Sequence, residues 1–215
     1  DSELRTNIVE NKANLKKTKS RNYEVGLKSR TNKYSYDLAI YQNDVKDEVT
    51  AVKQNWTTSY ENAGETQKRG LEFNTAYMLN KNITLGGSYA YSNFKFKEFK
   101  EEGTYDRNGN YLPYIPKHQY SMFAMYKNQG FKTRVQFRSW GSYYMDNANS
   151  QKYEGYDFVT DLMIGYEKRN HNVQLNINNL FDKHYAMSAQ KDLDGDITYK
   201  AAAPRTAMLT YTYKF

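Results

Sequence analysis

The chain has 215 residues, a formal net charge of +7, a mean hydropathy of −0.97 and 22 tyrosines, but no cysteine. The lack of cysteine excludes disulfide frameworks, thiolate metal sites and cysteine nucleophiles. The sequence contains no apolar run of about 18 residues, which excludes a membrane-spanning helix, and its polar first residues are not expected to form a signal peptide.

Apolar and polar residues alternate at a period of two through most of the chain, which is typical of half-buried β-strands. This pattern predicts an all-β fold. In chain order, the expected strands lie near residues 20–30, 33–44, 58–79, 82–97, 117–127, 130–141, 153–167, 171–181 and 204–215.

Each predicted strand has one apolar and one polar face. In FKTRVQFR (131–138), for example, Phe131 and Val135 share one face, and Lys132 and Arg134 share the other. In a soluble β-sandwich the basic face would meet water, whereas in a membrane barrel the apolar face would meet lipid. In the barrel, a slip of one residue would place cations in hydrocarbon at about 2–4 kcal/mol each, so the register would be tightly set.

Short and long connections alternate strictly along the chain. The short ones lie near 29–33, 79–82, 127–130 and 167–172, and the long ones near 44–58, 98–116, 142–152 and 182–203. This alternation is typical of antiparallel outer-membrane β-barrels, which have short periplasmic turns and long external loops. A nine-stranded sheet would leave two open edges, and unpaired backbone groups in lipid cost several kcal/mol each. Residues 1–215 are therefore expected to be the C-terminal part of a larger barrel.

Six blocks of the sequence carry a family resemblance. NLKKTKSRNYEVGLKSR (14–30), YQNDVKDEV (41–49), ENAGETQKRGLEFN (61–74), NGNYLPYIPKH (108–118), NINNLFDKHYA (176–186) and PRTAMLTYTYKF (204–215) resemble, in this order, the final strands of TonB-dependent outer-membrane receptors of the ferric-siderophore type. The resemblance covers nearly the whole chain. It implies the last nine strands of a plugged barrel of about 22 strands. The plug domain, the TonB-contacting box and the earlier strands are missing from these residues.

The resemblance implies energy-coupled uptake of a ferric siderophore, or of a similar scarce ligand, across the outer membrane of a Gram-negative bacterium. The implied partners are the ligand, the TonB system acting through the plug, outer-membrane lipid and lipopolysaccharide, and the barrel assembly machinery, which would recognise the terminal Phe215. A passive porin or a surface adhesin barrel remains an alternative.

No cofactor, catalytic site or nucleic-acid partner is expected. The three histidines, His118, His171 and His184, form no convincing arrangement with a nucleophile and an orienting acid. His171 is expected in a solvated turn. The cations are spread along the chain and interleaved with 24 acids, and no strand face combines a basic cluster with stacking aromatics.

Candidate ligand contacts are aromatic and cationic residues near the predicted outer rim, because Tyr, Trp and Arg suit an anionic complex with aromatic or amide surfaces. They are Trp56, Tyr60, Arg107, Tyr114, Arg138, Trp140, Tyr143, Tyr144 and Tyr153. An aromatic girdle or packing within the loops is the alternative role for the rings. For Arg138, the alternative role is pairing with a plug carboxylate.

Two loop stretches, YDRNGNY (105–111) and KDLDGDIT (191–198), resemble calcium-binding loops. Both lack the full ligand spacing and the distant bidentate glutamate, and Asp, Asn and Gly are also ordinary turn residues. The sequence therefore predicts turns at both places and no metal site.

Overall fold

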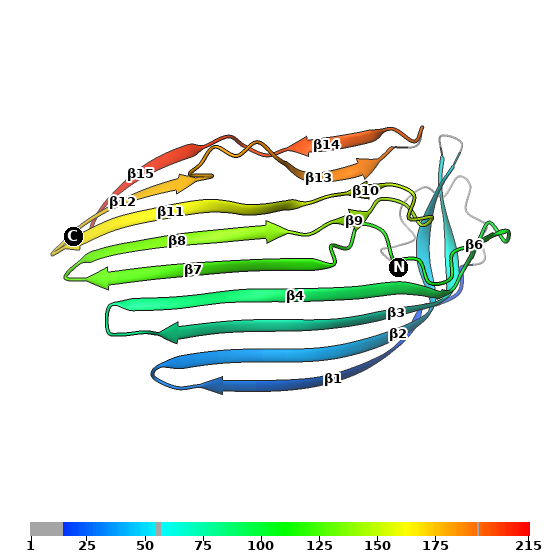
Figure 1. The fold of residues 1–215 in the computed structure, drawn as a ribbon, viewed down its shortest axis with the longest axis horizontal. Coiled ribbons are helices and arrows are strands. Elements are labelled where there is room, and N and C mark those ends of the chain that lie inside the picture. The colour runs from blue at the N-terminus through cyan, green and yellow to red at the C-terminus, as the bar shows by residue number, and fades with distance from the viewer. Residues whose placement is uncertain (1–14, 55–56, 193) are drawn as a thin grey trace.

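The computed structural model describes residues 15–54, 57–192 and 194–215. These residues contain an antiparallel sheet of nine strands, in the order β1-β2-β3-β4-β7-β8-β11-β12-β15 (Figure 1). The strands are β1 (Lys19–Arg30), β2 (Tyr34–Gln54), β3 (Thr57–Met78), β4 (Ile83–Glu98), β7 (His118–Asn128), β8 (Phe131–Trp140), β11 (Tyr156–Lys168), β12 (His171–Asn178) and β15 (Thr206–Tyr213). The nine strands predicted from the sequence are confirmed.

Three of the four long connections contain small hairpins that lie outside the main sheet. These are β5 (Lys100–Glu101) with β6 (Tyr105–Asp106), β9 (Tyr143–Tyr144) with β10 (Lys152–Tyr153), and β13 (Ala186–Lys191) with β14 (Ile197–Ala201). The short turns gather at one end of the sheet, which we call the turn end, and the long connections gather at the other, the loop end (Figure 1).

The prediction of a long connection at 44–58 is wrong. β2 and β3 pair from Tyr34 with Tyr77 to Gln54 with Thr57, so most of this segment is strand. The polar sequence misled the prediction, because backbone hydrogen bonds form the ladder whatever the side-chain polarity. Asp47 (φ 54°) and Gly64 lie opposite each other and are not paired, while the register is the same on both sides of them. Beyond this unpaired position the hairpin bends away from the sheet (Figure 1).

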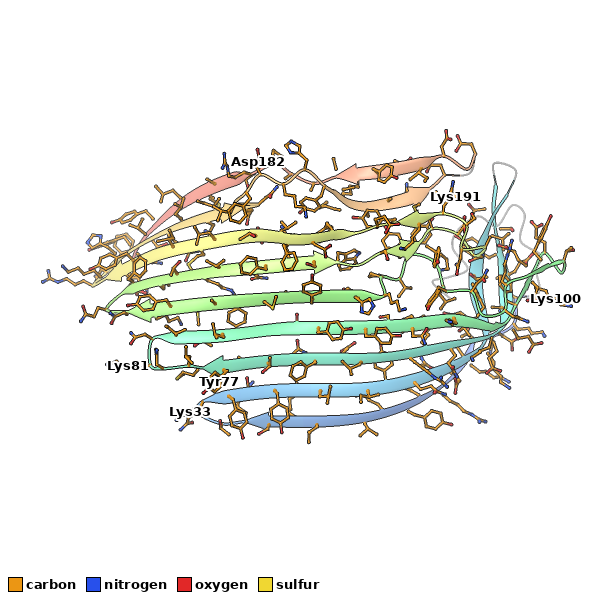
Figure 2. All side chains as sticks on the ribbon, viewed as in Figure 1. Lys33, Tyr77, Lys81, Lys100, Asp182 and Lys191 are labelled. Atoms are coloured by element: carbon orange, nitrogen blue, oxygen red, sulfur yellow. The ribbon has the colours of Figure 1, made fainter. Side chains whose placement is uncertain are left out.

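The sheet keeps the predicted apolar and polar faces. One continuous row of its apolar face runs through Tyr77, Leu85, Ala124, Val135, Leu162 and Ile177, each paired with the next. We call this the outer face and the polar one the inner face. Figure 2 shows side chains projecting along the whole sheet, and large apolar residues stay exposed, among them Val25 at 78% and Leu209 at 70%. Such extensive apolar exposure marks a surface that contacts lipid or a partner.

Neighbouring strands pack closely on the inner face through glycine. A Cβ atom added at Gly86 would lie 2.5 Å from the Phe123 ring on β7, so only glycine leaves room for that ring. The Arg134 guanidinium lies over the same ring, 4.1 Å from the centre of Phe123. At this position the inner face therefore packs an aromatic ring against both a glycine and a charged group.

No helix suited to crossing a membrane occurs among the residues that the structure describes. At the turn end, His171 is the first residue of β12, where its Nδ1 lies 2.7 Å from the Tyr211 hydroxyl. It is exposed, as predicted, but it belongs to a strand rather than to a turn.

Candidate functional site

The long connections pack against one another at the loop end. Two small apolar clusters hold them together, one made of Val52, Ala63, Phe96 and Phe99, and the other of Tyr143, Met145, Tyr153 and Ala189. Each cluster joins segments that are far apart in the chain. The loop end is thus a folded layer built from several connections.

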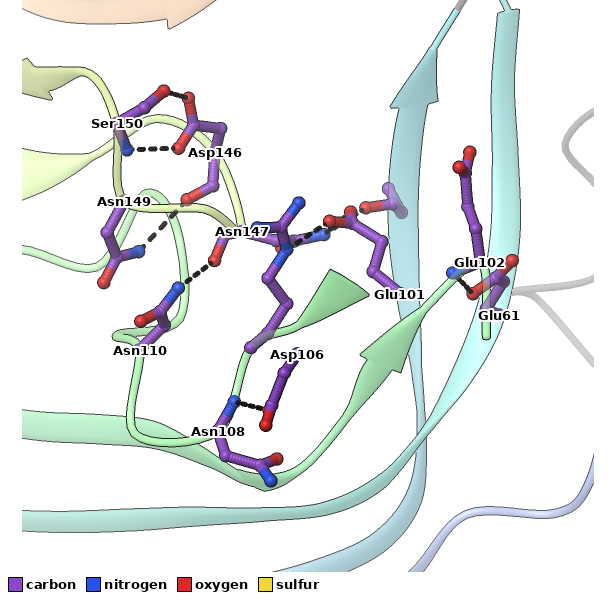
Figure 3. Close-up of polar contacts among 12 residues, drawn as sticks. Glu61, Glu101, Glu102, Asp106, Asn108, Asn110, Asp146, Asn147, Asn149 and Ser150 are labelled. Atoms are coloured by element: carbon purple, nitrogen blue, oxygen red, sulfur yellow. Dashed lines mark hydrogen bonds and ion pairs between the residues drawn. The ribbon is translucent and has the colours of Figure 1, made fainter. Parts of the chain in front are cut away.

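A buried polar network links three of these segments (Figure 3). Glu101 and Asn147 are 8% and 6% exposed. The Arg107 Nε donates to Glu101 Oε2 at 2.6 Å, and the Asn147 Nδ2 donates to Glu101 Oε1 at 2.7 Å and to the Ala51 carbonyl at 3.1 Å. Asn110 Nδ2 donates to the Asn147 carbonyl at 2.9 Å. Asn147 therefore ties the 141–155 connection to β2 and to the 99–117 connection.

A second ion pair brings in the β13–β14 hairpin. Lys191 Nζ lies 2.9 Å from Asp146 Oδ2, and Asp146 also accepts hydrogen bonds from the Ser150 amide and hydroxyl. Burial alone would raise the pKa of Asp146, but the hydrogen bonds from Ser150 and Lys191 outweigh it and hold the pKa below its ordinary value. Asp146 is therefore a fixed negative charge at neutral pH.

These segments enclose a pocket of about 410 Å³. Its lining includes Arg107, Tyr114, Met145, Asp146, Asn147 and Lys191. Both cations have a carboxylate partner, so the pocket offers ion pairs, an aromatic ring and apolar surface together. Such a lining suits a small organic ligand of mixed polarity. No group of three or more His, Asp or Glu side chains placed to hold a metal ion occurs in the described part of the chain.

A family model described as the β-barrel of TonB-dependent receptor-like proteins matches residues 2–180. The chain belongs to the TonB-dependent receptor family. Its nine strands are therefore part of a receptor barrel wall, as the resemblance of the six sequence blocks had implied.

Similar proteins within this TonB-dependent receptor family are named for iron complexes. The "Ferrichrome outer membrane transporter/phage receptor" of Escherichia coli K12 is 30% identical over 212 residues, which cover 92% of this chain and 27% of that protein. The "Ferrioxamine B receptor" of Salmonella typhimurium LT2 is 24% identical over 183 residues, or 80% of this chain and 25% of that protein. The chain thus spans about a quarter of the length of these relatives.

Solved receptor structures have the same fold. The closed form of the ferric-catecholate import receptor Fiu from E. coli K12 superposes with a TM-score of 0.72 at 27% identity, covering 94% of this chain and 28% of that one. The unliganded ferric citrate transporter FecA has a TM-score of 0.76 at 22% identity, and the match covers 91% of this chain and 31% of the FecA chain. This similarity supports the fold alone.

The predicted contact residues of this receptor barrel fall into separate groups. Arg107 and Tyr114 line the loop-end pocket. Tyr60 is half-buried on the part of β3 that lies on the loop-end side of Gly64, and Trp56 lies outside the described residues.

Arg138 and Trp140 line a hollow of about 370 Å³ against the wall, together with Gln119. Arg138 Nε lies 3.0 Å from Asp161 Oδ2 on the neighbouring strand β11. The sequence suggested a plug carboxylate as its partner, but the carboxylate beside it in the described residues belongs to the wall itself.

Three of the predicted tyrosines pack within the loop layer. Tyr143 and Tyr153 are buried and donate hydrogen bonds to the carbonyls of Ala189 and Ala186, so they anchor β13. Burial and the neighbouring Tyr143 raise the pKa of Tyr153 to about 12. The half-buried Tyr144 stacks on Tyr111, with 6.0 Å between ring centres.

The sequence reasoning missed the pocket residues that form its buried network and second ion pair, namely Glu101, Asp146, Asn147 and Lys191. Only Lys191 lay in a stretch that had been singled out, KDLDGDIT, and that stretch was interpreted as turn chemistry. The sequence does not show that the four residues meet, because they come from three different connections.

Proposed function

We propose that this chain forms part of the wall and outer mouth of a receptor that takes up a ferric siderophore or a similar scarce complex. The match to the TonB-dependent receptor family over residues 2–180 carries the proposal, together with relatives named for ferrichrome and ferrioxamine B. The pocket at the loop end supports it, because the Arg107–Glu101 and Lys191–Asp146 ion pairs and the Tyr114 ring line one hollow and offer polar and aromatic surface to an incoming complex.

The proposed location is the outer membrane of a Gram-negative bacterium. The apolar outer face would contact lipid, the loop end would face the outside, and the turn end would face the periplasm. The polar inner face would meet a plug domain, through which TonB supplies energy. In this proposal the chain binds and guides its ligand without breaking a bond, so it is not an enzyme.

Uptake by the full-length receptor tests this function. The receptor is expressed in a strain that lacks its own ferric-siderophore receptors, and the cells are given ⁵⁵Fe-loaded ferrichrome, ferrioxamine B or a ferric catecholate. We expect accumulation of at least one complex, and we expect it to disappear in a TonB-deficient strain. Uptake that is unchanged without TonB, or ion conduction through the purified receptor in planar bilayers, would indicate a passive channel instead.

The chain's last residue supplies a proposed assembly signal. Phe215 is fully exposed and packs edge-on against Tyr213, with 5.2 Å between ring centres. We expect Phe215→Ala to lower the fraction of receptor that migrates as a folded barrel in unboiled gel lanes. An unchanged fraction, with normal insertion, would remove the barrel assembly machinery as a partner of this residue.

A further inference from the structure

The loop end is acidic, although the chain as a whole is basic. The segments 44–58, 98–116, 142–152 and 182–203 together contain 8 Lys and Arg against 12 Asp and Glu, whereas the whole chain has 31 against 24. The excess of positive charge therefore lies outside the loop end. A ligand that approaches these segments meets a net negative charge, which attracts cations and repels anions.

The loop-end pocket shows the same excess of negative charge. Its charged lining residues are two cations and four acids, namely Arg107, Lys191, Glu101, Asp146, Asp192 and Asp194. Each cation is opposed by one carboxylate, because Arg107 pairs with Glu101 at 2.6 Å and Lys191 pairs with Asp146 at 2.9 Å. The lining thus has two more negative charges than positive ones, those of Asp192 and Asp194.

Asp192 and Asp194 lie in the turn between β13 and β14. Asp192 Oδ2 accepts a hydrogen bond from the Thr198 hydroxyl, and Asp194 Oδ1 accepts one from the Asp196 amide at 3.2 Å. Both donors are neutral. Within the residues that the structure describes, neither carboxylate forms an ion pair with a cation. The turn therefore holds two negative charges at the pocket without balancing them.

Asn147 gives an independent indication that the pocket lacks a donor. This residue lines the pocket and is 6% exposed. Its Nδ2 donates to Glu101 Oε1 and to the Ala51 carbonyl, which fixes the amide (Figure 3). Its Oδ1 accepts no hydrogen bond from any described residue. Because a buried acceptor without a donor is unfavourable, an N–H group that enters the pocket would gain a partner here.

Tyr114 adds an aromatic face to the same lining. Its φ is 63°, a value that bulky residues rarely adopt and keep only where their surroundings hold them. The Tyr114 amide donates to the Tyr144 carbonyl at 2.8 Å, and its hydroxyl accepts from the Lys191 amide at 3.4 Å. The ring is 38% exposed, and aromatic faces attract ammonium groups. It is thus fixed next to the turn that carries the two carboxylates.

We propose that this pocket binds an ammonium group carried on an arm of the ferric complex. The inference rests on the proposed function and names the class of its ligand, a complex with positive charge on a flexible arm. A volume of about 410 Å³ lies near the lower limit for ligand pockets and suits part of a complex. The sequence led us to expect an anionic ligand, but Arg107, the predicted cationic contact in this pocket, is already paired with Glu101.

The test compares two ferric complexes that differ by one charge. The purified full-length receptor in detergent is titrated with ferrioxamine B, which carries a free ammonium group, and with its N-acetylated form, which holds iron with the same groups but lacks that charge. Quenching of the receptor's own fluorescence gives the two affinities. We expect the receptor to bind the ammonium form about fivefold more tightly.

Variants of the β13–β14 turn locate the charge that sets this preference. In D192N/D194N the amide oxygens can still accept the hydrogen bonds from Thr198 and from the Asp196 amide, so the turn should keep its fold while both charges are removed. We expect this variant to bind the two complexes equally. The matched control is D196N, which removes a charge from the same turn at a residue outside the pocket lining and should keep the preference.

A probe without iron separates this inference from the proposed function. Met145 lines the pocket and is 2% exposed, so its methyl resonance reports what enters. We expect pentylammonium to shift this resonance and pentanoate to leave it unchanged. A shift with pentylammonium in a receptor that takes up no iron complex would reject the proposed function alone. Normal uptake with equal affinities for the two forms of ferrioxamine B would reject the inference alone.

Several other results would also overturn the inference. They are tighter binding of ferric citrate than of ferrioxamine B, loss of the preference in D196N as fully as in D192N/D194N, and a Met145 resonance that responds to neither probe or equally to both. A heat-dependent mobility shift confirms that each variant is folded before titration.

Discussion

Asn147 is predicted to hold the loop-end layer together as one unit. Its Nδ2 faces two acceptors, Glu101 Oε1 and the Ala51 carbonyl, which fixes the orientation of the amide. In Asn147→Ala both hydrogen bonds are lost. A bond to a charged group contributes about 1.5–3 kcal/mol and a neutral one about 0.5–1.5 kcal/mol, so the free energy of opening the layer should fall by about 2–4 kcal/mol.

Hydrogen exchange of backbone amides measures this opening directly. Since 1.4 kcal/mol corresponds to tenfold, the loop-end amides should exchange about 30 to 700 times faster in the variant. Useful reporters are Tyr111, whose amide donates to Asn149 Oδ1 at 2.7 Å, and Met145, whose amide donates to the Gln151 carbonyl at 3.0 Å. Amides within the nine-stranded sheet should be unaffected.

The control is Asn128→Ala at the turn end, where the residue is exposed and its side chain makes no hydrogen bond within the described residues. This variant should leave loop-end exchange unchanged. The reasoning is refuted if Asn147→Ala accelerates only its own connection while Tyr111 stays protected, because the connections would then open independently.

Three further predictions concern the wall and the second ion pair. Val135→Arg on the outer face should destabilise the barrel by about 2–4 kcal/mol, while Gln136→Arg on the inner face should be nearly neutral. Urea unfolding in lipid vesicles measures both changes, and equal effects would contradict the assignment of the faces. Gly86→Val should crowd the Phe123 ring and destabilise the barrel by about 1–3 kcal/mol, which should lower the temperature at which the folded gel band is lost. An unchanged temperature would mean that the ring is free to move. The folded-state pKa of Asp146 is lowered, so the stabilisation that this carboxylate gives to the loop end is present above its ordinary pKa and is lost as pH falls through the folded-state pKa. Hydrogen-exchange protection of loop-end amides should therefore drop in strong acid in the parent protein but not in Asp146→Asn.

The nine strands could be predicted from sequence because a strand with lipid on one side and polar groups on the other must alternate at a period of two. FKTRVQFR (131–138) shows this pattern. The outer face carries Phe131, Thr133, Val135 and Phe137, and the charged and amide side chains between them share the inner face. Register follows from the same pattern, because a one-residue slip would bury cations in lipid.

The loop end could not be predicted in the same way. The strand extension through Val49 and Ala51 was missed because its charged sequence resembles a loop, although its backbone forms a regular ladder. The pocket depends on Glu101, Asn147 and Lys191, whose sequence separations carry no periodic signal. Trp56 was predicted as a contact, and its position lies outside the described residues.

The most direct test of the central claim is single-cysteine labelling of the full-length receptor in intact cells. This chain has no cysteine, so Ala148→Cys at the loop end and Lys81→Cys at the turn end introduce the only thiols into these 215 residues. A membrane-impermeant maleimide is predicted to label Ala148→Cys in intact cells, and to label Lys81→Cys only after the outer membrane is opened. Rapid labelling of Lys81→Cys in intact cells, or labelling of both sites only in broken cells, would contradict a barrel wall that spans the outer membrane with its loop end outside.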